Sequence, residues 1–176
     1  MFSPAKSPRT ALSLFLCLSL FVCSISRGED SSRKHIIDTI KTFAHSWETG
    51  DLAAFTSTLD DRLLWAHPGG TLDKRGAIVF FQKWQKEWLN TRIYPTTFIV
   101  EGDRILAEYQ FCSTNRQTGK REAEGTAAIG QVKNGKIVLW KEYYDHSVGE
   151  LQSRGAIPVD EGEPSFPYPR TAKNRW

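Results

Sequence analysis

Apolar positions follow helical spacing up to about residue 90 and alternate with polar positions after it. The first helical pattern begins near Ser31 or Ser32, either of which can cap a helix, and it ends at Gly50. Its apolar stripe consists of Ile36, Ile40, Phe43, Ala44 and Trp47. This stripe predicts a helix with one buried face.

Two more helices are predicted at residues 52–59 and 76–89, with Asp51 and Asp73 as their caps. The apolar stripe of the helix at residues 76–89 consists of Ala77, Phe80, Phe81, Trp84 and Trp88. Between them, the short apolar segment 63–67 runs into a Pro-Gly-Gly sequence. This arrangement predicts a strand that ends in a turn.

Four strands are predicted in the second half of the chain, at residues 92–101, 104–114, 120–133 and 136–145. Short turns separate them, and Asn134-Gly135 is the strongest hairpin signal among these. Helices followed by an antiparallel meander are typical of an α+β domain. A curved sheet wrapped around the helices would enclose a cone-shaped hollow of the kind that holds ligands.

The first 26 residues have the pattern of a secretory signal peptide. Lys6 and Arg9 make the start basic, residues 11–25 carry no charge, and Ser24-Ile25-Ser26 offers small residues to a signal peptidase. The apolar run is short for a membrane-spanning helix. We therefore predict that residues 1–26 are a signal peptide and that the protein is exported (periplasmic or secreted). An uncleaved anchor is the alternative.

Residues 27–146 are long enough for one domain, and residues 147–176 hold four of the eight prolines, which predicts an extended tail with room for a helical turn at residues 148–154. Loss of the signal peptide leaves Cys112 as the one cysteine, so the mature chain forms no intramolecular disulfide. Loss of its two basic residues leaves 21 basic and 20 acidic side chains. This balance gives no electrostatic reason to expect nucleic acid or a membrane surface as partner.

The last predicted strand carries the pattern that bears most on function. Trp140, Glu142 and Tyr144 alternate with their neighbours and therefore share one face. A carboxylate between two aromatic rings is costly on a buried face unless it is paired. The face opens to water, or Glu142 has partners, or its carboxylate acts on a bound molecule.

Four segments resemble the SnoaL-like branch of the nuclear transport factor 2 (NTF2) superfamily. They are Trp47-Glu48-Thr49-Gly50-Asp51, Leu64-Trp65-Ala66-His67-Pro68-Gly69-Gly70, Arg75-Gly76-Ala77-Ile78, and the last hairpin from Gly135 to Asp145. The resemblance implies a cystatin-like cone, in which three N-terminal helices pack against a curved antiparallel sheet. The superfamily includes ketosteroid isomerases, polyketide cyclases, limonene epoxide hydrolases and dehydratases. It also includes transport, assembly and immunity proteins without catalytic activity.

The resemblance also implies roles for single residues. His67, directly before Pro68, stands where the isomerases have the Asp that acts as general base. Glu142, two residues past Trp140, stands where the epoxide hydrolases have a carboxylate that activates water. The oxyanion acid of the isomerases falls near Ala127, which cannot donate a proton, and this argues against steroid isomerisation.

Both candidate catalytic residues also have structural interpretations. His67 either lines the hollow, where histidine suits proton transfer near neutrality, or bonds a loop carbonyl at the strand end. Glu142 either lines the hollow, with His67 as its partner, or forms a salt bridge with Arg104 or Lys141. No metal-ligand spacing and no activated nucleophile is recognisable in the sequence, so no metal or cofactor is expected.

These patterns favour an exported small-molecule-binding protein, and the resemblance implies that it is a homodimer. The expected ligand is apolar or aromatic, and its binding residues are Trp47, Trp65, Trp140 and Tyr144. If the protein is an enzyme, it is a cofactor-independent isomerase, dehydratase or hydrolase in which His67 or Glu142 transfers a proton. The alternative is a non-catalytic interaction or dimerisation module whose cone is filled by its own side chains.

Overall fold

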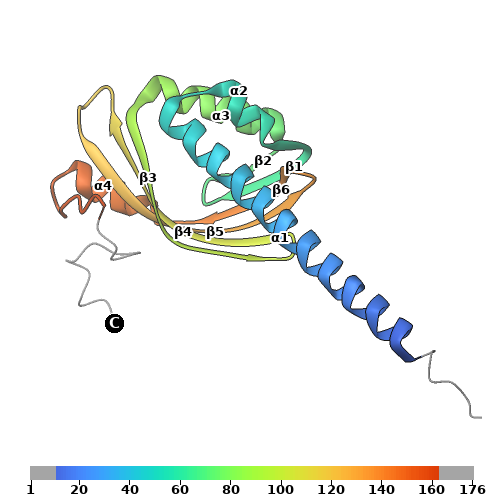
Figure 1. Ribbon diagram of the computed structural model, residues 1–176. Coiled ribbons are helices and arrows are strands. Elements are labelled where there is room, and N and C mark those ends of the chain that lie inside the picture. The colour runs from blue at the N-terminus through green and yellow to red at the C-terminus, as the bar shows by residue number, and fades with distance from the viewer. Residues whose placement is uncertain (1–10, 163–176) are drawn as a thin grey trace, which may run out of the picture.

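The computed structural model describes the backbone of residues 11–162 and the side chains of residues 30–145 and 147–162. Its elements are α1 (Ala11–Thr49), α2 (Leu52–Ser57), β1 (Leu59–His67), β2 (Gly70–Leu72), α3 (Lys74–Glu87), β3 (Trp88–Glu101), β4 (Arg104–Asn115), β5 (Arg121–Lys133), β6 (Lys136–Tyr143) and α4 (His146–Ser153). Helices α1, α2 and α3 lie over the concave face of a bent sheet, as the α+β prediction requires (Figure 1).

The six strands form one sheet in the order β2-β1-β6-β5-β4-β3. Strands β3 to β6 form the predicted antiparallel meander, and its last turn has positive φ angles at Asn134 and Gly135. The sheet is mixed, however, because β1 pairs in parallel with β6. The predicted curved antiparallel sheet is therefore confirmed for β3 to β6, and the pair of β1 with β6 adds one parallel pairing that was not predicted. In the sequence, β1 lies between the helices α2 and α3. In the sheet it pairs with β6, the last strand of the meander, although no hairpin connects the two strands.

The sheet bends because several strand pairs change register. Strands β3 and β4 shift between Pro95 and Thr97, and β5 and β6 shift between Gln131 and Val132. An extra residue at such a point bends the strand and increases its twist. The far ends of β3 to β5 consequently curve toward the helices (Figure 1).

Helix α1 is longer than predicted, since it begins at Ala11 and continues through the predicted signal segment. Among its described side chains, those of residues 30–35 are exposed and that of Ile36 is the first to be buried. Its N-terminal part extends away from the sheet (Figure 1). Among the residues whose side chains are described, no helix has the length and apolar character to cross a membrane.

Two other element boundaries differ from the prediction. Helix α2 ends at Ser57, so Leu59 opens β1 rather than closing a helix. Helix α3 ends at Glu87, and Trp88 is extended at φ −125° as the first residue of β3. The ring of Trp88 still stacks on Trp84 at 4.8 Å, and this contact resembles the helical i,i+4 contact that its spacing predicted.

The core between helices and sheet consists largely of aromatic rings. Trp47 of α1 lies 4.8 Å from Phe81 of α3 and 6.0 Å from Trp65 of β1, measured between ring centroids. Phe55 stacks on Phe81 at 4.2 Å. Each such pair contributes about 0.5–1.5 kcal/mol beyond the area it buries. The predicted apolar stripes of the first and third helices therefore meet in one cluster.

Helix α4 covers an edge that the sheet leaves open. The last β6 residue, Tyr143, pairs with Ala127, so residues 121–126 of β5 have no strand beside them on that side. The side-chain amide of Gln152 accepts from the Ala123 N–H at 2.8 Å and donates to its carbonyl at 3.0 Å. Gln152 thus takes the place of a neighbouring strand at this residue.

The segment after α4 also packs on the sheet. Gln110 donates to the Asp160 carbonyl and accepts from the Gly162 N–H, both at 2.8 Å, and Arg121 forms an ion pair with Glu161. The tail predicted for residues 147–176 is therefore helical up to Ser153 and bound to the sheet up to Gly162. Residues 163–176 lie outside the described part of the chain.

Candidate functional site

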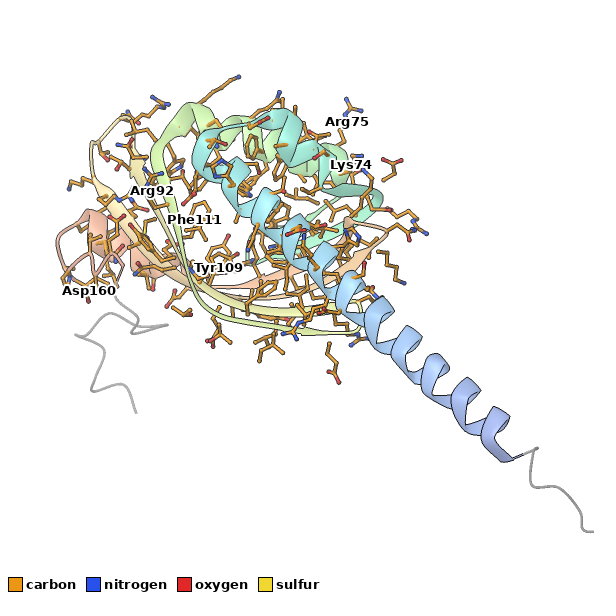
Figure 2. The ribbon with its side chains drawn as sticks, viewed as in Figure 1. Lys74, Arg75, Arg92, Tyr109, Phe111 and Asp160 are labelled. Carbon is orange, nitrogen blue, oxygen red and sulfur yellow. The ribbon has the colours of Figure 1, made fainter. Side chains whose placement is uncertain are left out.

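A cavity of about 660 Å³ lies between the helices and the concave face of the sheet. Aromatic side chains are prominent in its lining: Phe43, Trp47, Trp65, Phe80, Trp84, Trp88, Phe98, Tyr109, Phe111, Trp140 and Tyr144. Figure 2 shows Tyr109 and Phe111 projecting from β4 into the space beneath α1. The large number of rings in the sequence therefore supplies both a core and a ring-lined cavity.

Glu142 lies in the wall of this cavity and accepts three hydrogen bonds from neutral donors. The indole N–H of Trp65 donates to Oε2 at 2.9 Å, and that of Trp140 donates to Oε1 at 2.9 Å. The hydroxyl of Tyr109 donates to Oε1 at 2.7 Å. A buried carboxylate is tolerated when its charge is shared with such donors.

Strand pairing brings these donors together. Trp65 of β1 pairs directly with Trp140 of β6, and Glu142 follows Trp140 by two residues on the same face. Gly130 of β5 pairs with Trp140 from the other side. A Cβ at Gly130 would lie 2.8 Å from the Trp140 ring, so the ring can keep this position only next to a glycine.

Burial keeps the two tyrosines of the site protonated. The pKa of Tyr109 is raised well above its ordinary value, first by burial and then by the charge of Glu142. Burial also raises the pKa of Tyr144, with further contributions from Glu142 and Glu124. Tyr109 therefore remains a hydrogen-bond donor to Glu142 throughout the neutral pH range.

The carboxylate of Glu142 retains capacity for one more hydrogen bond. An ionised carboxylate offers about four lone-pair positions. Among the described residues, Oε1 accepts two bonds and Oε2 accepts one. The remaining position on Oε2 can accept a hydrogen bond from a bound molecule or take a proton from it.

His67 lines the same cavity at the end of β1. Its Nδ1 accepts from the Gly69 N–H at 3.1 Å, and its ring lies 5.7 Å from that of Phe80. A ring nitrogen that accepts carries no proton, so a neutral His67 has its proton on Nε2. The structural interpretation expected His67 to bond a loop carbonyl. The loop group that it bonds is instead the N–H of Gly69.

The structure brings His67 and Glu142 to one cavity but does not join them. Among the described hydrogen bonds of Glu142, the donors are two indoles and a phenol, and His67 is not one of them. The alternative salt-bridge partners, Arg104 and Lys141, are exposed and do not bond Glu142. The four predicted ligand-binding residues, Trp47, Trp65, Trp140 and Tyr144, all line the cavity.

Besides Glu142, four acidic residues line the cavity, and the sequence analysis gave a site role to none of them: Glu48, Glu108, Glu122 and Glu124. Of these, Glu122 and Glu124 lie on β5. Burial raises the pKa of both carboxyls, and the charge of Glu122 helps to raise that of Glu124 to about 7. Oε1 of Glu124 accepts from the Gly149 N–H of α4 at 3.2 Å.

Other chemistries find less support in the described residues. Within residues 30–145 and 147–162, no three His, Cys, Asp or Glu side chains are grouped so that they could hold a metal ion. Cys112 is buried, and burial raises the pKa of its thiol to about 12. It therefore stays a thiol and is not an activated nucleophile.

The match to known families fits this geometry. A family model described as a SnoaL-like domain matches residues 40–140. The chain belongs to this family. The match to the SnoaL-like domain includes Trp47, Trp65, His67 and Trp140 and ends two residues before Glu142. No protein of curated function matches the sequence.

Solved structures confirm the NTF2-like cone of this SnoaL-like domain. An LEH-like epoxide hydrolase from M. tuberculosis is 17% identical with a TM-score of 0.61, and the match covers 70% of this chain and 92% of that one. A protein of ketosteroid isomerase-like fold from Catenulispora acidiphila, in complex with trimethylamine, is 15% identical with a TM-score of 0.61, covering 66% and 92%. TerC, co-crystallised with polyporic acid, is 19% identical with a TM-score of 0.60, covering 68% and 98%. At these identities the likeness shows a shared fold.

Proposed function

We propose that this SnoaL-like domain binds a small molecule in its cavity and uses Glu142 as the proton acceptor of a cofactor-independent reaction. One observation carries the proposal. Three neutral donors hold Glu142 in the wall of a ring-lined cavity and leave Oε2 able to accept one more proton or hydrogen bond. The reaction class is an isomerisation, cyclisation, dehydration or hydrolysis.

The arrangement suits proton transfer for two physical reasons. Hydrogen bonds from Trp65, Tyr109 and Trp140 fix the direction of the carboxylate, so less order is lost when a substrate binds. The surrounding rings are less polar than water, which strengthens electrostatic interactions next to them. His67 is the second candidate for moving a proton, because its Nδ1 is an acceptor and Nε2 carries the proton.

Two similar structures support a small organic ligand. The trimethylamine complex and the polyporic acid complex each hold an organic molecule on the same fold. The epoxide hydrolase shows that the fold also supports hydrolysis. A cavity of about 660 Å³ is of the size that small-molecule sites have, and it argues against a cone filled by its own side chains.

The first experiment is native mass spectrometry of the protein purified from its own host. We expect a retained small molecule, whose identity then provides the assay. Glu142→Gln should abolish turnover while the fold is retained, and His67→Ala should reduce it. Glu150→Gln, at an exposed position of α4, is the matched control and should leave turnover unchanged. Full turnover in Glu142→Gln would overturn the assignment of Glu142.

We also propose that residues 1–26 are removed on export. Cleavage after Ser26 would leave every described buried residue of α1 in the mature chain, since the first is Ile36. Mass measurement of the protein from its host should give a chain that begins at Arg27. An intact chain recovered from the membrane fraction would support the uncleaved anchor instead.

A homodimer is proposed through the outer face of the sheet. Ile99, Leu106 and Ile129 lie side by side across β3, β4 and β5, and all three are exposed. A row of apolar side chains on a sheet face is typical of an interface. Sedimentation equilibrium should show a dimer that Ile129→Lys converts to a monomer. Val79→Lys, on the exposed face of α3, should leave the dimer intact.

A further inference from the structure

Three of the five carboxylates that line the cavity, those of Glu122, Glu124 and Glu142, differ in how well they are paired. Glu142 has three hydrogen-bond donors, whereas Glu124 has one backbone N–H at 3.2 Å. Glu122 accepts none of the described hydrogen bonds, and none of the three takes part in a described salt bridge. Charge at Glu122 and Glu124 is therefore poorly compensated by the protein itself.

Glu122 and Glu124 converge at one end of the cavity. A Cβ placed on Gly149 would lie 2.5 Å from Oε1 of Glu124 and 2.6 Å from Oε2 of Glu122. Both oxygens are thus close to the same point and within about 5.1 Å of each other. One positively charged group can approach two carboxylates at this spacing.

This end lies well apart from Glu142 on the same wall. Glu142 pairs with Ala128 of β5. Glu124 precedes Ala128 by four residues on that strand, which is about 13 Å along the backbone. Tyr144 feels the charge of both, since each raises its pKa. A molecule that spans this distance can place one group at the acidic pair and another at Oε2 of Glu142.

Aromatic rings surround the acidic end as well. Phe111 of β4 pairs directly with Glu124, and its ring lies 5.3 Å from that of Trp84. Trp84 in turn stacks on Trp88, and all three rings line the cavity. Ring faces next to carboxylates form an environment that favours a cation over a neutral or anionic group.

Basic side chains around the cavity do not neutralise this end. Lys41 and His45 are exposed on α1, and His45 lies 3.8 Å from Glu48 rather than near the acidic pair. Asp145, which caps α4, adds a negative charge that raises the pKa of Glu124 further. The negative charge that β5 presents to the cavity therefore comes from Glu122 and Glu124, and Asp145 acts on it from outside the lining.

We infer that the ligand of this cavity is an organic cation whose charged nitrogen binds at the Glu122–Glu124 pair. The inference rests on the proposed function and specifies the chemical class of its ligand. The apolar body of the ligand extends along the rings toward Glu142. Binding of the cation favours ionised Glu124, so affinity for a permanently charged ligand falls as the pH drops below about 7.

The test compares two isosteric probes, phenyltrimethylammonium and tert-butylbenzene, by titration of the tryptophan fluorescence of the full chain. At pH 8, phenyltrimethylammonium should bind about tenfold more tightly than tert-butylbenzene. This preference for the cation should be smaller at pH 6. Glu124→Gln should weaken the cation about tenfold and leave the neutral probe unchanged. Glu122→Gln is the second variant if the first does not fold, and Glu150→Gln is the control that should change neither affinity.

The outcomes separate the inference from the proposed function. If tert-butylbenzene binds as tightly as the cation or more tightly, and neither variant changes the affinities, the inference of a cationic ligand is wrong. The proposal that the cavity binds a small molecule would still stand. Binding of neither probe, combined with no retained small molecule in the native mass spectrum, would contradict both.

Discussion

Trp65 on β1 donates its indole N–H to Glu142 on β6 at 2.9 Å, across 77 residues of sequence. The bond exists because β1 pairs in parallel with β6 and places Trp65 beside Trp140. It ties the helical half of the chain to the end of the meander at the carboxylate of the candidate site. The one strand pair that departs from an antiparallel sheet is therefore the pair that builds the site.

Trp65→Phe should destabilise the fold more than the loss of ring area explains. The variant keeps an aromatic ring but removes one of three donors to a partly buried carboxylate, which costs about 1–3 kcal/mol. Urea unfolding measures this as a change in the free energy of unfolding. Trp88→Phe is the control, because the Trp88 indole donates in none of the described hydrogen bonds. An equal loss in the two variants would show that the bond to Glu142 contributes little.

Gly130→Ala should displace the Trp140 ring. The added Cβ would lie 2.8 Å from that ring, and overpacking of this kind costs about 1–3 kcal/mol. Pairing the change with Trp140→Phe removes the part of the indole that clashes. The double variant should then lose less stability than the two single losses added together, which a double-mutant cycle measures. Additive losses would mean that the backbone, and not the ring, absorbs the strain.

Gln152→Met should remove the hydrogen bonds by which α4 protects the edge of β5 at Ala123. Methionine is similar in shape but leaves the N–H and C=O of Ala123 without their side-chain partners, at a cost of about 1–3 kcal/mol for each buried group. Hydrogen exchange at Ala123 should accelerate along with the loss of stability. Ser153→Ala, one residue further along α4 and outside these bonds, should leave both unchanged. Unaltered protection at Ala123 in Gln152→Met would show that α4 does not guard this edge.

Periodicity predicted the order of elements well because helices and hairpins are local. The stripes of α1 and α3 and the turn at Asn134-Gly135 are encoded within a few residues of one another. The parallel pairing of β1 with β6 is not local, and nothing near Trp65 specifies which strand lies beside it. The end of α3 was misplaced because the ring of Trp88 stacks on Trp84 from an extended backbone.

The site was predicted in part for a related reason. Trp140, Glu142 and Tyr144 share a face by alternation alone, and all three line the cavity. Alternation does not say which face is inward on β4 and β5, so it did not place Glu124 in the cavity. Tyr109 is a donor to Glu142 and was also overlooked. Its apolar neighbours two residues away on β4, Ala107 and Phe111, were the available signal, because they mark the inward face.

The last prediction concerns pH, and it follows from Glu124. Burial and the charge of Glu122 raise the pKa of the Glu124 carboxyl from 4.5 to about 7 in the folded state. A raised carboxyl pKa means that the folded protein holds this proton more tightly than the unfolded chain does. The contribution of this proton to the free energy of unfolding is fully present below pH 4.5 and is lost as the pH rises to about 7. The total loss is about 3 kcal/mol at most.

Urea unfolding of the wild type and of Glu124→Gln at several pH values between 4.5 and 7.5 measures this effect. The amide keeps the shape of a protonated carboxyl and does not titrate. The wild type should therefore lose stability relative to Glu124→Gln across this range and run parallel to it above pH 7.5. Glu150→Gln should track the wild type throughout, since Glu150 is exposed. A constant difference between the wild type and Glu124→Gln at every pH would show that Glu124 titrates alike in both states and that the acidic end of the cavity is open to bulk water.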